Sequence, residues 1–465
     1  MDRHSNSEPL QPGRRVRVPP PGPHSRALAR RLAATECGEV TFLSDEFPVF
    51  WRRARGTYVE DVDGNVYLDM TGAFAVAGVG HGHPRVVEAI ERQASRLIHG
   101  MGDVHPSESK VLLAERLTAV APGDLGWPIF STSGAEAVES VRKTCMVASG
   151  RPGLVAFEGA YHGLTFGALE ATDREHFRRP FAAQWAGRVQ RAPYPYCYRC
   201  PLGRVPGDCG LACLDYVQEL LERPVDGERP GGVLIEPVQG RGGTIVPPEG
   251  YLVGLRDLCH RFDVLLLFDE VFTGFGRTGA WFAAERFGVI PDVMAVGKAL
   301  GGGMPISACI GRGEVMESWG RSTGEAVHTS TFLGHPLASA AALATLDVME
   351  AEGLPSRART LERVLMDGLR DLQSRHPDVV GEVRGVGLMA GLELVENPET
   401  RTPAGRLAWR LVTEALQEGL LLLPEGPAGN VIGLSPPLVV TEQEIEEALG
   451  IIDRLLERLA RGLWE

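Results

Sequence analysis

The sequence predicts an α/β protein with two domains: a large domain whose mainly parallel sheet is flanked by helices, and a smaller α+β domain. Between residues 80 and 334, short apolar segments such as VLLLF alternate with amphipathic helical segments. This alternation is typical of βαβ units, in which helices cover both faces of a parallel sheet. From His335 onward long helical segments dominate, and the last helix begins with the capping box Thr441–Glu444. A length of 465 residues also exceeds what one core usually supports.

Four segments follow one another along the chain. Residues 1–24 are rich in proline, arginine and serine, and we predict a disordered arm there. Residues 25–79 contain a helical segment and two alternating runs around Asp63-Gly64, which predict a hairpin. We assign this segment to the small domain, residues 80–334 to the large domain and residues 335–465 to the C-terminal part of the small domain.

Composition and charge exclude several classes of function. The net charge is −13, the isoelectric point is near 5.5, and no long stretch is dominated by basic residues, so nucleic-acid binding is not expected. The apolar runs are too short to span a bilayer, and the N-terminus lacks the apolar segment of a secretory signal. We therefore expect a cytoplasmic protein. Eight cysteines at this length do not indicate a disulfide scaffold.

Lys298 occupies an unusual place in a chain that has only three lysines among its 47 lysine and arginine residues. Lys110 and Lys143 lie in amphipathic helical patterns, where a solvated helix face explains them. Lys298 instead ends the apolar run VMAVGK and precedes the glycine-rich ALGGG. A desolvated lysine loses its proton and acts as a nucleophile, which arginine does not do. The alternative is a lysine that only extends from a strand end to water.

Asp269 ends a second apolar run, VLLLFDEV. In open α/β sheets, ligands bind beyond the carboxyl ends of the strands, so Asp269 and Lys298 are expected at one edge. A plain ion pair would explain an acid and an amine there. Pyridoxal phosphate requires the same pair, because the carboxylate keeps the pyridine nitrogen protonated while the lysine holds the aldehyde as an imine.

Two further turns follow predicted strands. In STSGAEAVES, Ser133, Gly134 and Ala135 begin a helix whose N–H groups face an anion such as a phosphate; a simple serine N-cap is the alternative. In GAYHG, Tyr161 follows the strand LVAF, where its ring would stack on a planar cofactor or pack in the core. The segment GFGRTG matches a dinucleotide-binding pattern, but Asp269-Glu270 precede it and the first glycine comes too late to open a helix.

Four cysteines lie close together in a loop rich in proline, glycine and tyrosine. Cys197 and Cys200 form one pair, and Cys209 and Cys213 form a second pair with an unusual spacing. Two such pairs are typical of a small structural zinc site, whereas free cysteines are often simply buried. No metal is assigned.

Together, these residues resemble the class III pyridoxal-phosphate aminotransferases, the group of acetylornithine, ornithine, 4-aminobutyrate and omega-amine aminotransferases. The resemblance runs from about Phe47 to the C-terminus. Its motifs occur in one order: STSGAEAVE, FEGAYHG, IEPVQG, LLLFDEV-x-TGFGRTG, PDVMAVGKALGGGMP and HTSTFLGHPLA. It implies the fold of the PLP-dependent transferases, like that of aspartate aminotransferase, and pyridoxal 5'-phosphate as cofactor.

The resemblance also implies roles for individual residues. Lys298 would form the imine, and Asp269 would be the partner of the pyridine nitrogen. Further cofactor contacts are implied for Ser133, Gly134 and Ala135 at the phosphate, Tyr161, His162 and Val271 at the ring, Glu236 at its edge, and Thr331 at the phosphate of the neighbouring subunit. A homodimer with a shared active site follows from the last of these.

Three positions depart from the family's pattern. Phe272 stands where many members have glutamine, and Arg241 stands where EPVQGEGG has glutamate. Gly433 stands where many members have the arginine that binds the carboxylate of glutamate or 2-oxoglutarate. We hypothesise that Arg241 binds a substrate anion, or that the substrate is not a simple α-amino acid.

The implied activity is the transfer of an amino group from an amine or an α- or ω-amino acid to a keto acid through Lys298. A racemase or epimerase on the same fold is the first alternative, and an NAD(P)-dependent dehydrogenase that uses GFGRTG is a remote one. The donor is left open among 4-aminobutyrate, a diamine, an ω-amino acid, an amino sugar and a hydrophobic amine.

Overall fold

A seven-stranded sheet forms the centre of the large domain in the computed structural model, which describes residues 10–223 and 227–460. The four pairings from β9 through β8, β7 and β5 to β6 are parallel, whereas β10 pairs antiparallel with both β4 and β9. The mainly parallel sheet predicted from the sequence is confirmed. In spatial order the strands are β4 (Leu125–Ser131), β10 (Ser307–Arg312), β9 (Val293–Val296), β8 (Leu265–Asp269), β7 (Gly232–Ile235), β5 (Leu154–Phe157) and β6 (Val189–Ala192).

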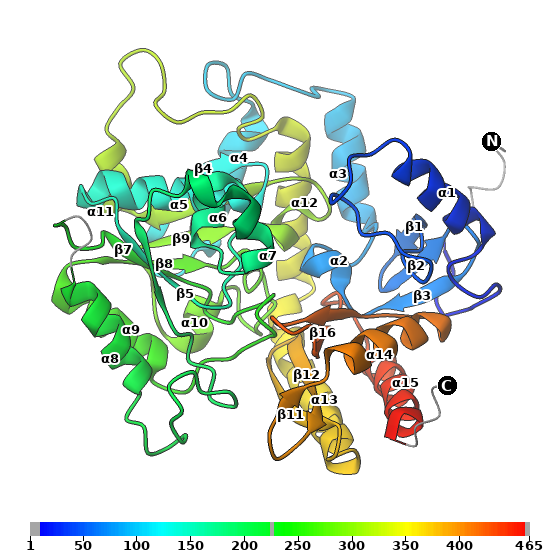
Figure 1. The fold of residues 1–465 in the computed structure, drawn as a ribbon. Helices are drawn as coiled ribbons and strands as arrows, with labels where there is room; N and C mark the ends of the chain where they lie inside the picture. The colour runs from blue at the N-terminus through cyan, green and yellow to red at the C-terminus, as the bar shows by residue number, and fades with distance from the viewer. Residues whose placement is uncertain (1–9, 224–226, 461–465) are drawn as a thin grey trace.

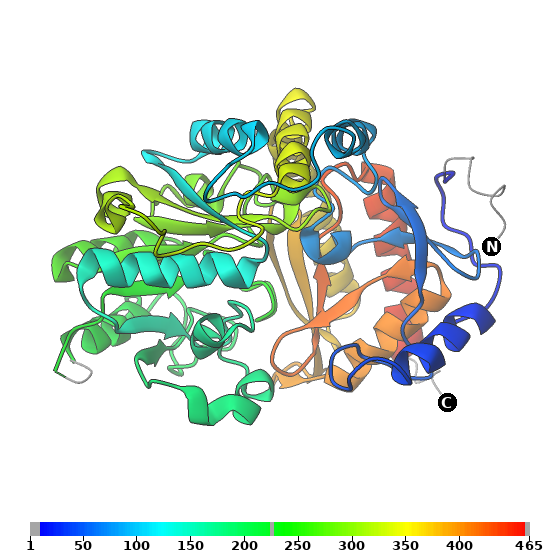
Figure 2. The same ribbon diagram turned by 90° about the horizontal axis from the view of Figure 1, so that it is seen from above.

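Both faces of this sheet are buried, because its strands carry apolar side chains on both sides. Leu267 packs in one core with Val138 and Val141 of helix α5, whereas Leu266 and Phe268 belong to the core on the opposite face. Helices therefore cover the sheet on two sides, as the βαβ pattern predicts. The helices near it are α4 (Glu108–Val120), α5 (Gly134–Ser149), α6 (Phe166–Ala171), α7 (Glu175–Arg178), α8 (Ala212–Glu222), α9 (Tyr251–Phe262), α10 (Ala283–Phe287) and α11 (Gly313–Met316) (Figures 1 and 2).

The small domain combines segments from both ends of the chain (Figure 1). Strand β3 pairs parallel with β14, although more than 300 residues separate them in sequence. Its first sheet has the order β1 (Trp51–Arg55), β2 (Tyr58–Asp61), β3 (Val66–Asp69), β14 (Leu420–Leu421). Its second sheet has the order β11 (Val380–Val386), β12 (Met389–Asn397), β16 (Val431–Leu434), β15 (Leu423–Glu425), with β13 (Thr402–Pro403) beside β12.

The remaining helices pack around the small domain and between the domains. In the view from above, α12 lies between the two domains (Figure 2), and it packs against α3 and α4. These helices are α1 (Pro23–Ala33), α2 (Gly72–Ala75), α3 (Pro84–Ala94), α12 (Pro336–Ala351), α13 (Leu354–Arg375), α14 (Gly405–Gln417) and α15 (Glu442–Ala460). Within the described residues, none of the helices has the length and apolar character needed to cross a bilayer.

Part of the predicted N-terminal arm is ordered. Arg15 exchanges two backbone hydrogen bonds with Val66, each 2.7 Å long, and Leu10 is buried in the main core. A disordered arm was predicted for residues 1–24, but the structure is ordered from residue 10 onward. Backbone pairing and one apolar contact hold this segment in place despite its polar composition. Residues 1–9 lie outside the described residues.

Two local signals in the sequence form the structures that they predict. Strands β2 and β3 pair as an antiparallel hairpin whose turn contains Gly64 at φ 84°. At the start of α15, Glu444 N donates to Thr441 Oγ1 and Thr441 N donates to a Glu444 carboxylate oxygen. Both are local patterns, in which neighbouring residues alone satisfy the backbone.

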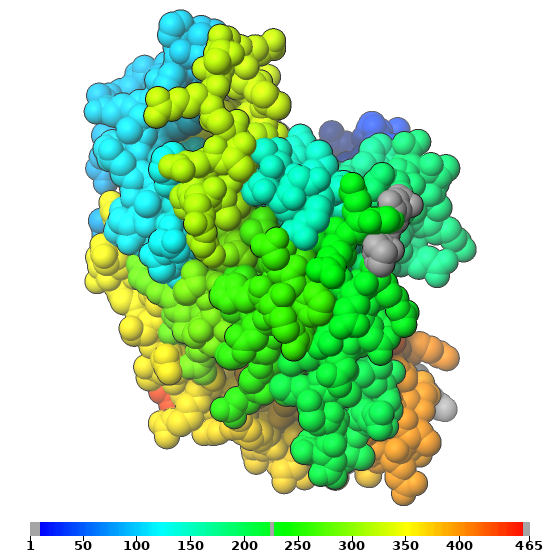
Figure 3. Space-filling model, turned by 90° about the vertical axis from the view of Figure 1, so that its left-hand side faces the viewer, coloured from blue at the N-terminus to red at the C-terminus, as the bar shows by residue number. Residues whose placement is uncertain are grey.

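The segment before α12 lies against the segment before α4. Thr329 Oγ1 donates to Asp103 Oδ2 at 2.8 Å, and the rings of His99 and Phe332 lie 5.3 Å apart. Figure 3 shows these segments side by side, in yellow-green and cyan, on the left-hand side of the molecule as it is drawn in Figure 1.

Candidate active site

A cavity of about 360 Å³ lies at the carboxyl edge of the large sheet. Strands β5, β7, β8 and β9 are parallel, and β4 runs the same way because both it and β9 pair antiparallel with β10. The turns that follow these five strands therefore meet at one edge. The cavity is lined by Ser133, Gly134, Ala135, Tyr161, His162, Gly163, Leu164, Glu236, Arg241, Asp269, Val271, Phe272 and Lys298.

Lys298 follows β9 in a strained conformation. Its φ is +44°, a left-handed value that is uncommon for non-glycine residues and costs backbone strain. Its Nζ lies 4.6 Å from the centroid of the Phe272 ring. Burial lowers the pKa of the amine, whereas the charges of Asp269 and Glu236 raise it. A buried amine with a lowered pKa is neutral more often than a solvated one, as a nucleophile must be.

The Asp269 carboxylate contacts His162. The family resemblance implied His162 as a neighbour of the cofactor ring, but it did not predict this contact with Asp269. Its Oδ2 lies 2.7 Å from His162 Nδ1, and its Oδ1 accepts a hydrogen bond of 3.0 Å from Val271 N. Both side chains are almost completely buried. His162 Nε2 is buried and has no hydrogen-bond partner among the described residues.

Glu236 bridges two neighbouring turns. Its carboxylate accepts hydrogen bonds from Tyr161 N at 3.1 Å and from Gly240 N at 3.2 Å. Burial raises its pKa to about 7, and the charge of Asp269 acts in the same direction while His162 lowers it. Glu236 therefore fixes the Tyr161 turn against the strand that precedes Gly240.

The start of α5 supplies backbone donors at the cavity. Ser133 and Glu136 form a capping box, so Ser133 is the N-cap of α5. This cap does not use the N–H groups of Gly134 and Ala135. The first N–H groups of a helix have no acceptor within it, which leaves those of Gly134 and Ala135 for an anion. A Cβ at Gly134 would lie 2.8 Å from a Val271 methyl group, so glycine is required for this close approach.

Arg241 and Tyr161 meet across the cavity. The Arg241 guanidinium carbon lies 5.6 Å from the centroid of the Tyr161 ring. Burial raises the pKa of Tyr161, and the charge of Arg241 lowers it. Thr331, in contrast, is exposed and does not line the cavity, so its predicted contact with a neighbouring subunit stays a prediction.

Glu425 is an acid near the site that the sequence did not reveal. Its Oε2 accepts a hydrogen bond of 3.0 Å from Thr244 Oγ1, and its charge acts on Arg241 and Lys298. A Cβ at Gly433 would lie 2.4 Å from the Glu425 carboxyl carbon. The carboxyl group thus takes the space of a side chain at position 433. In the sequence, only the glycine at position 433 indicated that another group fills this space, and it did not show that the group is Glu425.

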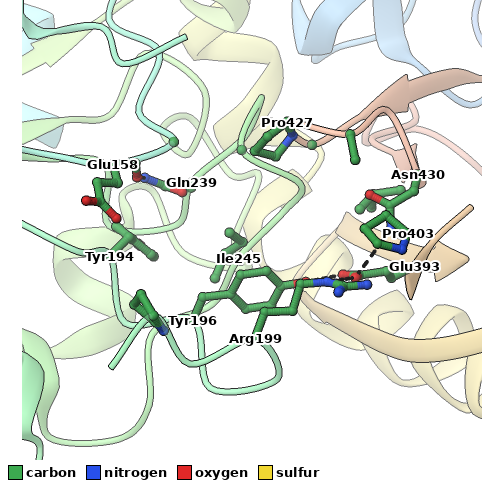
Figure 4. Close-up of a pocket in the computed structure, with 16 residues that line it drawn as sticks. Glu158, Tyr194, Tyr196, Arg199, Gln239, Ile245, Glu393, Pro403, Pro427 and Asn430 are labelled. Carbon is green, nitrogen blue, oxygen red and sulfur yellow. Dashed lines mark hydrogen bonds and ion pairs between the residues drawn. The ribbon is translucent and has the colours of Figure 1, made fainter. Parts of the chain in front are cut away.

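A second cavity, of about 250 Å³, lies between the two domains. Figure 4 shows Tyr196 and Arg199 of the large domain beside Glu393 of β12. The Glu393 carboxylate accepts hydrogen bonds from Tyr196, Arg199 and Arg384. The positive charge of Arg384 outweighs burial and keeps the pKa of Glu393 below its ordinary value. All the described partners of Glu393 are side chains of the protein, so this acid joins the two domains. The candidate active site is therefore the first cavity.

Two other sequence patterns lie outside the cavity lining. The GFGRTG segment is a series of turns in which Arg277 is buried and its Nη1 donates to Leu388 O and Pro436 O. It opens no helix, so it has no pyrophosphate site. The four loop cysteines are free, and no group of His, Cys, Asp or Glu in the described part of the chain is arranged to hold a metal ion.

Comparison with known proteins decides the family. A model described as aminotransferase class III matches residues 42–456. The chain belongs to the class III aminotransferases. These enzymes use pyridoxal phosphate, so the cofactor predicted from the sequence is confirmed, and the dehydrogenase alternative is wrong.

Individual relatives of this aminotransferase have different activities. It is 39% identical over 461 residues to a 4-aminobutyrate aminotransferase of Mycobacterium tuberculosis, covering 97% of this chain and 99% of the relative. It is 35% identical to an alanine/serine racemase of Pyrococcus horikoshii, covering 96% and 94% of the two chains. An omega transaminase of Pseudomonas jessenii, solved in complex with PMP, superimposes with a TM-score of 0.86 at 29% identity, over 93% of this chain and 98% of that one.

The cavity of this aminotransferase suits pyridoxal phosphate. It offers an amine for the aldehyde, a buried carboxylate for the pyridine nitrogen, and unpaired N–H groups at a helix start for the phosphate. Val271 and Tyr161 line the same cavity, where they would pack against a planar ring. These groups come from the turns that follow β4, β5, β8 and β9 at the same sheet edge.

Proposed function

We propose that this aminotransferase takes its amino group from a donor that carries a carboxylate remote from the reacting amine, as ω-amino acids do. One observation carries the proposal: the Arg241 guanidinium lines the same cavity as Lys298, beside the Tyr161 ring. An arginine in a partly buried cavity favours a carboxylate, which it binds through two parallel hydrogen bonds. The relative named 4-aminobutyrate aminotransferase supports the same substrate class.

Lys298 and Asp269 have separate roles in this proposal. Bound pyridoxal phosphate supplies an electron-withdrawing ring that stabilises negative charge on the substrate carbon. Lys298 Nζ would take up the proton from that carbon and give it back later in the transfer, and burial prepares the amine for this role. Asp269 would be the partner of the ring nitrogen, and His162 holds the carboxylate in place.

We further propose that the active unit is a homodimer in the cytoplasm. Exposed apolar side chains gather beside the exposed Thr331. Burying such a patch against a second copy would bring Thr331 to a neighbouring site. The patch comprises Ile98, Met101, Val104 and Phe332, each at least half exposed.

Sedimentation equilibrium tests this interface. The wild type should be a dimer, and Met101→Glu should convert it to a monomer. A monomeric wild type at micromolar concentration would exclude this interface.

A racemase or epimerase is the second candidate. The relative named alanine/serine racemase favours it, as does Gly433, which leaves no arginine where many members bind the carboxylate of glutamate. In a racemase, the proton returns to the substrate carbon on its other face and no amino group leaves. Loss of optical purity of L-alanine without any keto acid would therefore identify this activity.

The test of the proposed function is a half-reaction. The holoenzyme is mixed with 4-aminobutyrate or 5-aminovalerate without an acceptor, and the absorbance of the cofactor is followed. We expect conversion of the cofactor to its amine form, which pyruvate or 2-oxoglutarate then reverses. Lys298→Arg should bind the cofactor without this conversion. No conversion with any amine donor in the wild type would overturn the proposal.

A further inference from the structure

Two arginines contact an aromatic pair beside the active-site cavity, one against each ring. The guanidinium carbon of Arg241 lies 5.6 Å from the centroid of the Tyr161 ring. The Tyr161 and Phe177 rings meet edge to face with centroids 5.8 Å apart, and the guanidinium carbon of Arg174 lies 5.6 Å from the Phe177 centroid. Arg174 immediately precedes α7, so a segment outside the cavity lining contributes this second charge.

Neither guanidinium has an acid partner in residues 10–223 and 227–460. No side chain or backbone oxygen described there forms an ion pair or a hydrogen bond with Arg174 or Arg241. The acid next to Arg174, Asp173, is already engaged by Arg191 Nε at 3.0 Å and by Gly159 N at 2.8 Å. Two like charges near each other without an anion are unfavourable, and burial together with Arg241 lowers the pKa of Arg174.

Glu425 does not cancel these charges. Its carboxylate interacts electrostatically with Arg241, but its hydrogen bond goes to Thr244 Oγ1. Burial raises the pKa of Glu425 to about 7, so part of the population is neutral near neutral pH. An anion that enters the cavity therefore meets Arg241 in the lining, and Arg174, outside the lining, adds a second guanidinium whose hydrogen-bond donors are free within the described structure.

We propose that Arg174 and Arg241 together form the receptor for the carboxylate that the substrate carries at the end remote from its reacting amine. This inference rests on the proposed function and adds Arg174 to it. The aromatic rings hold both guanidinium groups in place, so less conformational entropy is lost when the carboxylate binds. The substrate class is then ω-amino acids and the oxo acids formed from them, with uncharged amines disfavoured.

The first experiment compares donors that differ only in the carboxylate. The kcat/KM values of the holoenzyme are measured for 4-aminobutyrate and 5-aminovalerate, and for butylamine and pentylamine. We expect Arg174→Ala to lower the ratio of carboxylated to uncharged donors by about 10- to 100-fold, chiefly through KM, as for loss of a charged hydrogen bond. Arg174→Lys should recover part of the ratio.

Arg178→Ala provides the matched control. Arg178 ends the same helix, α7, and its guanidinium carbon lies 5.6 Å from the Trp185 ring centroid, so it too is an arginine placed over an aromatic ring. It does not act on Tyr161, whose pKa responds to Arg241 and Arg174. We expect Arg178→Ala to keep the donor ratio of the wild type. An equal loss in both variants would overturn the proposal, because it would show a general effect of this segment.

A binding measurement separates this inference from the proposed function. Glutarate, a dicarboxylate without an amine, is titrated into the holoenzyme by calorimetry, and we expect weaker binding in Arg174→Ala and Arg174→Lys. Unchanged glutarate affinity and an unchanged donor ratio in Arg174→Ala would overturn the arginine receptor while transamination persists. Absence of any cofactor conversion in the wild type would overturn the proposed function, and glutarate binding would still decide the role of Arg174.

Discussion

At the residue scale, the site depends on how burial changes ionisable groups. The amine of Lys298 has a lowered pKa because it is buried, and the carboxyl groups of Glu236 and Glu425 have raised pKa values for the same reason. Burial therefore acts in the same direction on the amine and on these two carboxyl groups, because it favours the neutral form of each. The Asp269 carboxylate has a histidine as its neighbour: His162 Nδ1 lies 2.7 Å from its Oδ2.

Asp269→Asn tests the electrostatic role of this carboxylate. The amide has nearly the same shape but no charge, so we expect cofactor binding to persist while the half-reaction slows by about 10²- to 10³-fold, a typical effect of losing one preorganised charge. Stopped-flow absorbance measures the rate. Asp257→Asn on the exposed side of α9 should react like the wild type. A normal rate in Asp269→Asn would contradict the assignment.

Gly433→Ala tests the packing of Glu425. The added Cβ would displace the Glu425 carboxyl group from Thr244, and we expect a loss of about 1 to 3 kcal/mol in the free energy of unfolding, as for other overpacked sites. In a Glu425→Ala background the same change should cost much less, because the clashing group is gone. Urea unfolding of the four proteins of this cycle measures the coupling. Additive losses would show that Glu425 does not occupy this space.

At the element scale, strand ends and helix starts place the functional groups. Parallel strands deliver Glu236, Asp269 and Lys298 to one edge, and the capped start of α5 directs its first N–H groups there. The caps depend only on neighbouring residues, which explains why short sequence motifs predicted them.

The cap of α15 gives an element-scale prediction. Thr441 Oγ1 accepts the hydrogen bond of Glu444 N, and Glu444 Oε1 accepts a second one from Thr57 Oγ1 at 2.6 Å. We expect Thr441→Ala to lower the free energy of unfolding by about 1 kcal/mol, measured by urea denaturation. Thr441→Ser, which keeps the hydroxyl, should remain close to the wild type. Equal losses in the two variants would argue against capping as the cause.

At the scale of the whole molecule, buried acids make stability depend on pH. Burial raises the pKa values of Glu236, Glu270 and Glu425 from an ordinary 4.5 to about 7. Between these values, the folded protein keeps protons that the unfolded chain has released. The stability that these groups contribute is therefore fully present below about pH 4.5 and is lost as the pH rises through about 7.

Glu425→Gln isolates one of these groups. The amide cannot ionise, so the free energy of unfolding of the variant, relative to the wild type, should increase as the pH rises from about 5 to about 8. Using this difference matters because acids with lowered pKa values, such as Glu136 and Asp453, act in the opposite direction in both proteins. Denaturant unfolding at several pH values measures it. A difference independent of pH would show that Glu425 titrates normally.

The sequence alone determined the family, the cofactor and the local position of the main groups. Lys298 and Asp269 each end an apolar run, and Ser133 to Ala135 begin a helix, so backbone periodicity was enough to place them at strand and helix ends. Tertiary structure alone decided which distant residues meet. The His162 contact with Asp269, the Glu425 carboxyl group in the space at Gly433, and Arg174 beside the Phe177 ring all depend on packing between segments. Periodicity describes only neighbours along the chain, whereas these contacts arise when the segments bury their apolar faces against one another.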